Sequence, residues 1–155
     1  MHVVTVDIEG IQLGLDVGEV REVWRVSDVL AVPKASPMII GLINRRGAVV
    51  TLVHGHRVID VATTEEHPLG REYEVLILDH GGEQVAVAVS RLVDTIEVDP
   101  AQLLPIPPKL HLGVQRIALG VHPGQEQFTV IVSAARIFEC VRESAHDVAR
   151  AAVKS

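Results

Sequence analysis

Ten short apolar runs separated by turn residues set the hydrophobic pattern of this chain. They are rich in Val, Ile and Leu, and several alternate between apolar and polar positions. Branched side chains and alternation are typical of β-strands, because they fit a pleated surface with a buried face. The pattern therefore predicts strands over residues 3–8, 11–17, 20–26, 38–44, 48–53, 73–79, 83–89, 92–98, 113–121 and 128–132.

Glycine-containing turns indicate how neighbouring strands connect. Glu9-Gly10, Arg45-Arg46-Gly47 and Gly81-Gly82 each lie between two apolar runs. Glycine tolerates a positive φ, so these positions favour tight hairpins. Longer irregular connections are expected where prolines or polar residues interrupt the pattern, over residues 26–37, 62–72 and 100–110.

The period of the pattern changes in the last segment of the chain. Ser133 is a residue type that caps helices, and apolar residues then recur at steps of three or four. This spacing predicts an amphipathic helix over residues 133–153 with one apolar stripe. The stripe consists of Ile137, Val141, Ala145, Val148 and Ala152.

The two halves of the chain match when the first is shifted by 72 positions, so that Asp7 lies over Asp79. The same register aligns turn glycines, glutamines, acidic residues and prolines without a gap: Gly10 with Gly82, Gln12 with Gln84, Glu22 with Asp94, Pro33 with Pro105 and Gly41 with Gly113. Such self-similarity indicates a duplicated structural unit. The alternative is that valine-rich strands match by chance.

The number and length of the strands favour closed β units. Each half offers about five short strands, which are too many and too short for one open sheet with crossover helices. Closure of such strands into a barrel removes exposed edges. We therefore predict an all-β chain with two small barrels, closed or nearly closed, followed by the helix.

Composition argues against several classes of partner. The net charge is −6, whereas nucleic acids and anionic membranes attract basic surfaces. The single cysteine, Cys140, permits no intramolecular disulfide and favours a reducing, cytosolic setting. No signal peptide is predicted, and no apolar run is long enough to span a bilayer.

No sequence pattern in the chain indicates catalysis or a bound cofactor. His54 and His56 form the only close histidine pair, and zinc requires three or four ligands. The chain has no serine elbow, and "GLINRRG" precedes a strand where a phosphate loop would precede a helix. Cys140 lies among apolar neighbours, which favours a packed thiol. We predict no catalytic residue, no metal and no cofactor, and keep a metal protein built on the histidines as an alternative.

Charged residues set singly into apolar strands need partners. Arg46 at a hairpin turn is the expected counter-charge for Glu22, since a guanidinium can hold a carboxylate and still donate outward. The alternative is an ordinary surface ion pair that contributes little to stability.

Three stretches resemble the CheW family, the coupling proteins of bacterial chemosensory arrays. They are "VGEVREV" from Val17 to Val23, "VPKASPMIIGLINRRGAVV" from Val32 to Val50, and the segment from Gln84 to Pro108. The resemblance runs from about Val3 to Phe138. Its most specific element is the family pattern P-x-x-P-x-x-x-x-G-x-x-N-L-R-G, matched with one residue of tolerance by Pro33, Pro37, Gly41, Asn44, Arg46 and Gly47.

The resemblance implies a single CheW-like domain over 1–155 made of two intertwined five-stranded SH3-like β-barrels. The first subdomain is expected at about 12–80, and the second at about 1–11 and 81–138, with exchanged strands. No enzymatic activity and no cofactor are implied.

The resemblance further implies an adaptor that couples the cytoplasmic tips of methyl-accepting chemoreceptors to the regulatory domain of the histidine kinase CheA. Such a protein is cytoplasmic and recruited to membrane-associated receptor arrays. In the family the groove between the barrels takes the receptor helix, which here would involve Val20, Glu22, Asn44, Arg46, Gly47 and Val49. The kinase domain would dock on the second barrel near Val87, Val89 and Leu92.

The chain departs from the family pattern at several positions. Arg45 stands where the family carries leucine, and Ser90 where an aspartate is usual. Thr51, His54 and Gly55 replace a proline, an aspartate and a leucine. These departures favour, as an alternative, an interaction module that binds only receptor or only kinase, or that serves another motility or regulatory pathway.

Overall fold

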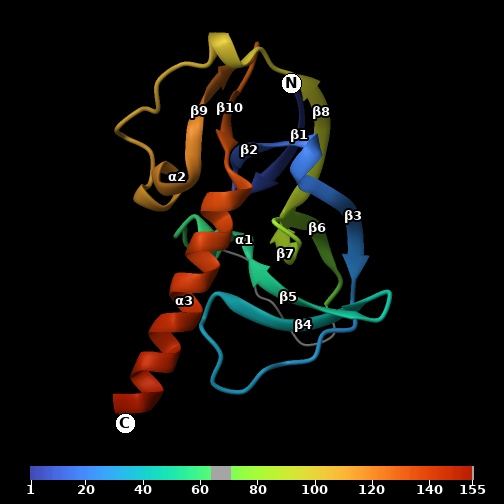
Figure 1. Cartoon of the computed structure of the whole chain (residues 1–155). Coiled ribbons are helices and arrows are strands. Elements are labelled where there is room, and N and C mark those ends of the chain that lie inside the picture. The colour runs from blue at the N-terminus through green and yellow to red at the C-terminus, as the bar shows by residue number, and fades with distance from the viewer. Residues whose placement is uncertain (64–70, 155) are drawn as a thin grey trace.

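The computed structural model describes residues 1–63 and 71–154, with side chains described up to residue 145. The described residues form two five-stranded sheets (Figure 1). One, which we call the β1 sheet, has the strand order β8 (Arg91–Glu97), β1 (His2–Ile8), β2 (Ile11–Asp16), β10 (Phe128–Val132) and β9 (Ala118–Pro123). The other, the β6 sheet, has the order β3 (Val20–Val26), β6 (Tyr73–His80), β7 (Glu83–Val89), β5 (Ala48–His54) and β4 (Ile39–Arg45).

Three hairpins turn as the sequence predicts. The loops Glu9-Gly10, Arg46-Gly47 and Gly81-Gly82 have positive φ at both residues, as a two-residue type I′ turn requires. The glycine N–H of the first two donates to an Asx side chain at 2.8 Å, from Gly10 to Asp7 and from Gly47 to Asn44. Gly82 donates in the same way to Asp79. A shared pattern, Asp or Asn three residues before glycine, therefore builds all three turns.

The two sheets exchange strands between the halves of the chain. The β1–β2 hairpin pairs in parallel with β10, and the β6–β7 hairpin pairs in parallel with β5. The strands of the two sheets correspond one to one in the same order, and the numbers of each corresponding pair differ by five, as for β1 and β6. This correspondence is what a duplicated unit predicts.

The exchange points differ from the expected subdomain boundaries. We expected breaks after residues 11 and 80, close to the hairpin turns, which would have split both hairpins. Each hairpin instead stays whole in one sheet, because its antiparallel ladder continues to the end of its second strand. The chain crosses between sheets at the 3₁₀ turn η1 (Val17–Glu19) and at Ser90, so β2 belongs with the second unit and β7 with the first.

The ungapped register also fails beyond the third strand of each half. A strand over 113–121 is predicted, but α2 (Leu112–Ile117) occupies its first part and β9 begins only at Ala118. This inserted helix shifts the later equivalences. Isolated bridges join Leu30 to Leu42 and Leu104 to Val121, so Gly41 corresponds to Gly120 rather than to Gly113.

The backbone pairing does not close either sheet into a barrel. Among the described residues, no ladder joins the edge strands β3 and β4, or β8 and β9. The β6 sheet nevertheless curls strongly, which brings Glu22 on β3 and Arg45 on β4, from its two edges, within 2.9 Å of each other. A side-chain contact, and no hydrogen-bonded ladder, joins these edges.

The hairpin strands are buried on both faces. One face of each lines the concave side of its own sheet, as Val75 and Ile77 do in β6 and Val3 does in β1. The opposite faces meet in a shared central core that contains, among others, Val6, Leu13, Leu76, Leu78, Val85 and Val87. Burial on both faces explains why these strands read as nearly continuous apolar runs.

Three of the described helices pack against this central core. The short α1 (Gly55–Val58) buries Val58, α2 buries Val114 and Ile117, and α3 (Ala134–Lys154) buries Ile137 and Phe138. Figure 1 shows α3 leaving β10 and running alongside the β6 sheet. Val141 packs against the core and Ala145 is exposed, whereas Val148 and Ala152 lie outside the residues whose side chains are described.

The start and middle of α3 are fixed by polar contacts. The Ser133 hydroxyl accepts from the Arg136 N–H at 3.3 Å, as its predicted capping role requires. The carboxylate of Glu19 accepts from Ala134, while burial and nearby Asp16 raise its pKa. Ser144 contacts Ser36 in the connection between β3 and β4. No helix in the described part of the chain is long and apolar enough to cross a membrane.

The two equivalent glycines provide a test of this fold. A Cβ at Gly41 would lie 2.4 Å from the Leu30 carbonyl oxygen, whereas one at Gly120 would come no closer than 3.0 Å to Leu103. We expect Gly41→Ala to lower the free energy of unfolding by about 2 kcal/mol, because backbone must move. Gly120→Ala should cost less than about 1 kcal/mol. Urea unfolding of both variants measures the difference, and equal losses would contradict the close approach at Gly41.

Candidate partner-binding surfaces

The charged cluster at the β4–β5 turn consists of Glu22, Arg45 and Arg46. Arg45 donates to one carboxylate oxygen, Glu22 Oε2, from Nε at 3.0 Å and from Nη2 at 2.9 Å. Arg46 Nη2 lies 3.5 Å from the other oxygen, Oε1. The side chains are 15% exposed for Arg45, 27% for Glu22 and 77% for Arg46. Glu22 is therefore held mainly by Arg45, the least exposed of the three side chains.

This geometry corrects the expected pairing. We predicted Arg46 as the counter-charge of Glu22, and that ion pair exists, but Arg45 is the closer and more buried partner. Alternation along β4 explains why. Arg45 faces the same side as the buried Ile43, whereas Arg46 is the first loop residue of the turn.

The cluster continues across the end of the curled β6 sheet. Arg45 Nη1 lies 3.4 Å from Gln84 Oε1, and Gln84 Nε2 lies 3.4 Å from Asp79 Oδ2. Arg21 Nε donates to the same Asp79 oxygen at 3.2 Å. The hydrogen bond from Gln84, followed by Arg21, lowers the pKa of Asp79. By alternation Asp79 and Gln84 face the same side as the core residues of this sheet, so the polar cluster covers the end of its apolar interior.

An apolar groove, which we call the β4 groove, lies beside this cluster. It has a volume of about 380 Å³ and is lined by Asp28, Val29, Leu30, Leu42, Ile43, Asn44, Gly47 and Val49. Leu30 and Val49 are 69% and 73% exposed. Large apolar side chains that remain exposed around a hollow are typical of a protein-docking surface.

A second groove, the β9 groove, occupies the equivalent place on the β1 sheet. It has a volume of about 160 Å³ and is lined by Leu104, Pro105, Pro107, Leu110, Val121, Phe128 and Val130. The equivalence follows from the parallel ladders. Thr51 pairs with Val85, and Val130 pairs with Leu13, which corresponds to Val85 in the shift of 72 positions. Val49 therefore corresponds to Phe128, which is 64% exposed.

Sequence reasoning did not find the β9 groove. The ungapped register pairs Val49 with Val121 and so conceals its equivalence to Phe128. The available signal was composition, since Phe128 is one of only two phenylalanines in an aromatic-poor chain.

The structure brings most of the predicted receptor-binding residues together. Glu22, Asn44, Arg46, Gly47 and Val49 surround the β4–β5 turn and the β4 groove. Asn44 and Gly47 bond to each other and shape the turn. Val20 is the exception, because it packs partly buried against the central core.

The structure separates the predicted kinase-binding residues. Val87 and Val89 lie in β7 with their side chains in the central core, 5% and 8% exposed, so they offer no docking surface. Leu92, on the edge strand β8, is exposed. The error has a physical reason, since both faces of β7 are buried and alternation alone cannot reveal an exposed one.

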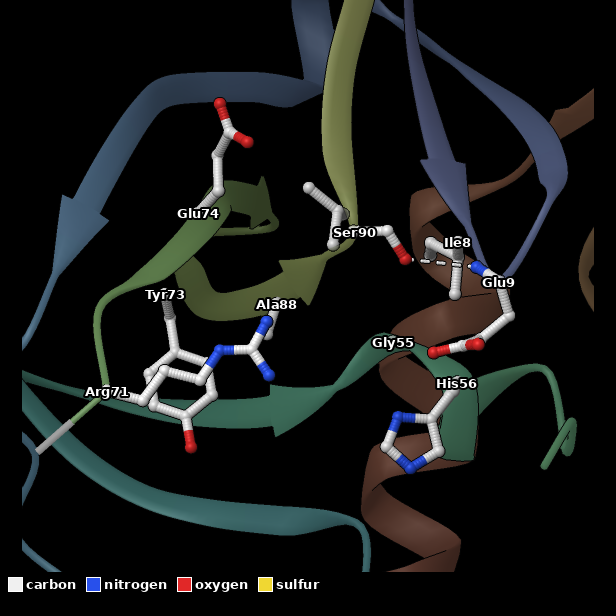
Figure 2. A pocket seen from close by; sticks show the side chains of 10 residues that line it. Ile8, Glu9, Gly55, His56, Arg71, Tyr73, Glu74, Ala88 and Ser90 are labelled. Atoms are coloured by element: carbon white, nitrogen blue, oxygen red, sulfur yellow. Dashed lines mark hydrogen bonds between the residues drawn. The ribbon is translucent and has the colours of Figure 1, made fainter. Parts of the chain in front are cut away.

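A small polar pocket between the two sheets is the remaining hollow of chemical interest. Figure 2 shows Glu9, His56, Arg71, Tyr73 and Ser90 around it, and the Ser90 hydroxyl accepts from the Glu9 N–H at 3.0 Å. Its volume is about 30 Å³. A space of this size holds about one or two water molecules, so it is too small for a substrate.

The histidine pair does not assemble a metal-binding group. His54 ends β5 and His56 lies buried in α1, with ring centroids 4.8 Å apart. Within residues 1–63 and 71–145, whose side chains are described, no cluster of three or more His, Cys, Asp or Glu side chains could hold a metal ion. Cys140 is buried, and its burial raises the pKa of the thiol, as expected for a packed cysteine.

Comparison with known proteins adds two findings. The family described as the CheW-like domain matches residues 2–141 of the chain. The structure is similar to that of the scaffolding protein TtCheW from Thermoanaerobacter tengcongensis, with a TM-score of 0.75 and 18% sequence identity over 89% of this chain and 92% of the other. At that identity the structural likeness shows a shared fold. No curated protein sequence matches the chain significantly.

Arg45 and Arg46 should differ in their contribution to stability. We expect Arg45→Ala to lower the free energy of unfolding by about 1–2 kcal/mol, because charge-assisted hydrogen bonds to Glu22 are lost. Arg46→Asn should change it by less than about 0.5 kcal/mol, since the side chain is exposed and asparagine tolerates a positive φ. Urea unfolding compares the two, and a larger loss for Arg46→Asn would show that Arg46 is the structural member.

Asp79 should make stability depend on pH. Its pKa lies below the ordinary value of 3.8, so its ionised form is favoured in the folded chain. The stabilisation relative to Asp79→Asn should be complete at about pH 6 and disappear as pH falls through 3.8 and below. Unfolding of both proteins across this range measures the difference. A pH-independent difference would exclude the carboxylate charge as its cause.

Proposed function

Because the chain belongs to the CheW-like domain family, we propose that it is a non-enzymatic adaptor that couples chemoreceptors to a CheA-type histidine kinase. The observation that carries the proposal is the pair of equivalent apolar grooves, one on each sheet. A coupling protein needs two surfaces that can be occupied at the same time, and the duplicated fold supplies two surfaces of similar construction.

The receptor tip docks at the β4 groove and the adjoining charged cluster in this proposal. Val49 and Leu30 provide exposed apolar contact, and Arg46 with Glu22 provides a charged rim. An apolar centre with a polar rim is the usual arrangement of protein interfaces. Asn44 and Gly47 contribute by holding the turn, whereas Val20 packs against the central core and does not line the groove.

The kinase regulatory domain docks at the β9 groove. Phe128 and Leu104 are its exposed apolar side chains, and aromatic residues are enriched at binding hot spots. Leu92 lies on β8, at the other edge of the β1 sheet, and is a secondary candidate. Recruitment to membrane-associated receptor arrays then follows from binding the receptor.

A module that binds only one partner is the second candidate function. It is favoured by the unequal size of the two grooves, about 380 and 160 Å³. It is also favoured by the departures from the family pattern, such as Arg45 and Ser90.

Two matched substitutions test the assignment of partners to grooves. Val49→Asp should weaken binding of a soluble receptor-tip fragment at least tenfold and leave kinase binding unchanged, because a charge would be buried in one interface only. Phe128→Asp should do the reverse. Both side chains are exposed, so both variants should fold, and each is the control for the other. Calorimetry with each partner provides the measurement.

The wild-type chain decides between the two candidate functions in the same assay. Binding of both partners at tens of micromolar or tighter supports the coupler. Binding of one partner alone supports the single-partner module, and binding of neither contradicts both.

A further inference from the structure

We propose that Arg45 is a positioning residue that keeps Arg46 available for a carboxylate on the partner. The β4 groove then selects an amphipathic segment that carries an acidic side chain beside its apolar contacts. This inference rests on the proposed role of the β4 groove in binding the receptor tip, and it specifies the chemistry of that binding.

The first step is that Arg45 occupies the Glu22 carboxylate. Two of its N–H groups donate to Glu22 Oε2, at 3.0 and 2.9 Å, and a third reaches Gln84. Arg45 is only 15% exposed. Charge-assisted hydrogen bonds with little access to water are the stronger kind, so Glu22 is largely neutralised.

The second step is that the cluster retains one unneutralised positive charge. Two guanidinium groups share a single carboxylate, and the more exposed of them, Arg46, lies at 3.5 Å from Oε1. An exposed pair at that distance contributes little, so another carboxylate can compete for Arg46. Arg46 lies in the turn between Asn44 and Gly47, which both line the groove, so it stands beside a partner bound there.

The third step is that the groove sets where the acidic group can lie. Leu30 and Val49 offer apolar contact, while Asp28 lines the same groove. An acidic partner residue is therefore favoured beside Arg46 and disfavoured beside Asp28. Attraction at one place and repulsion at another together give specificity.

Removing Arg45 should redirect Arg46 within the cluster. Without Arg45, Glu22 has Arg46 as its remaining arginine partner in the cluster, and the two would pair with each other. The positive charge offered to the partner would then be lost although Arg46 is still present. Arg45 therefore affects binding through Arg46.

Four variants test this mechanism by calorimetry with a soluble fragment of a chemoreceptor cytoplasmic tip. Arg46→Asn should weaken binding about tenfold, the factor expected for one lost charge-assisted contact. Arg45→Leu, which keeps apolar bulk at the position, should weaken it about threefold to tenfold. The double variant Arg45→Leu with Glu22→Gln should recover to within about twofold of wild type, because Arg46 is released again. Arg57→Ala removes an exposed arginine beyond the opposite end of β5 and should have no effect.

Recovery in the double variant separates positioning from a structural role. If Arg45 only supported the fold, removal of Glu22 as well would not restore binding. The salt dependence gives a second readout, since binding by Arg46→Asn should weaken less with salt than binding by wild type.

Changes in the receptor fragment identify the acidic partner. Each Asp or Glu of the fragment is changed to Asn or Gln, and one of these changes should abolish the further effect of Arg46→Asn. If no single acidic residue couples to Arg46, the proposal is wrong.

The remaining outcomes distinguish this inference from the function on which it rests. Failure of the wild-type chain to bind the fragment overturns the receptor-docking role and this inference with it. Normal wild-type binding that is unaffected by Arg45→Leu or Arg46→Asn overturns this inference alone. If Arg46→Asn instead reduces self-association in sedimentation and leaves receptor binding unchanged, the groove belongs to a second copy of the chain, and the proposal is overturned.

Discussion

The structure depends on burial of both faces of its two exchanged hairpins. One face of β6 and β7 lines the curled β6 sheet, and the other lies against the matching face of β1 and β2 in the central core. Strands buried in this way cannot slip in register, because a shift of one residue would move every side chain into the wrong core. The rigid centre leaves binding to the periphery, namely the edge strands, the hairpin turns and the connecting segments. Both apolar grooves lie there, beside the edge strands β4 and β9.

The sequence was sufficient to predict features determined by local chemistry. Three glycine-containing turns, nine of the ten predicted strands and the matched polar positions of the two hairpins follow from turn conformations and strand periodicity. Features set by tertiary contacts could not be predicted from the sequence. The segment that became α2 has apolar spacing short enough for either a strand or one helical turn. The strand patterns of β7 did not show that Val87 and Val89 face a second core.

Arg45 was recognisable in the sequence as a departure from the family pattern, but its role was not. The role of Arg45 depends on the curl of the β6 sheet, which brings the two edge strands β3 and β4 together. No local pattern records that β3 and β4 approach, since three strands lie between them in the sheet and the connection through Pro33 and Pro37 lies between them in the chain. The same contact joins the sheet edges and, in the receptor site proposed above, determines which arginine faces the partner. Under that proposal stability and recognition share one ion pair, and the two adjacent arginines have different roles.

The strand exchange also has a consequence for the order in which the chain can fold during synthesis. The β6 sheet needs residues up to Val89, whereas the β1 sheet needs β10, which ends at Val132. The β1–β2 hairpin is therefore made first but must remain without its parallel partner until most of the chain has left the ribosome. Non-local pairing of this kind folds slowly and exposes strand edges to other nascent chains. A rapidly translated copy of this protein should consequently depend more on chaperones than a domain of equal length with sequential pairing.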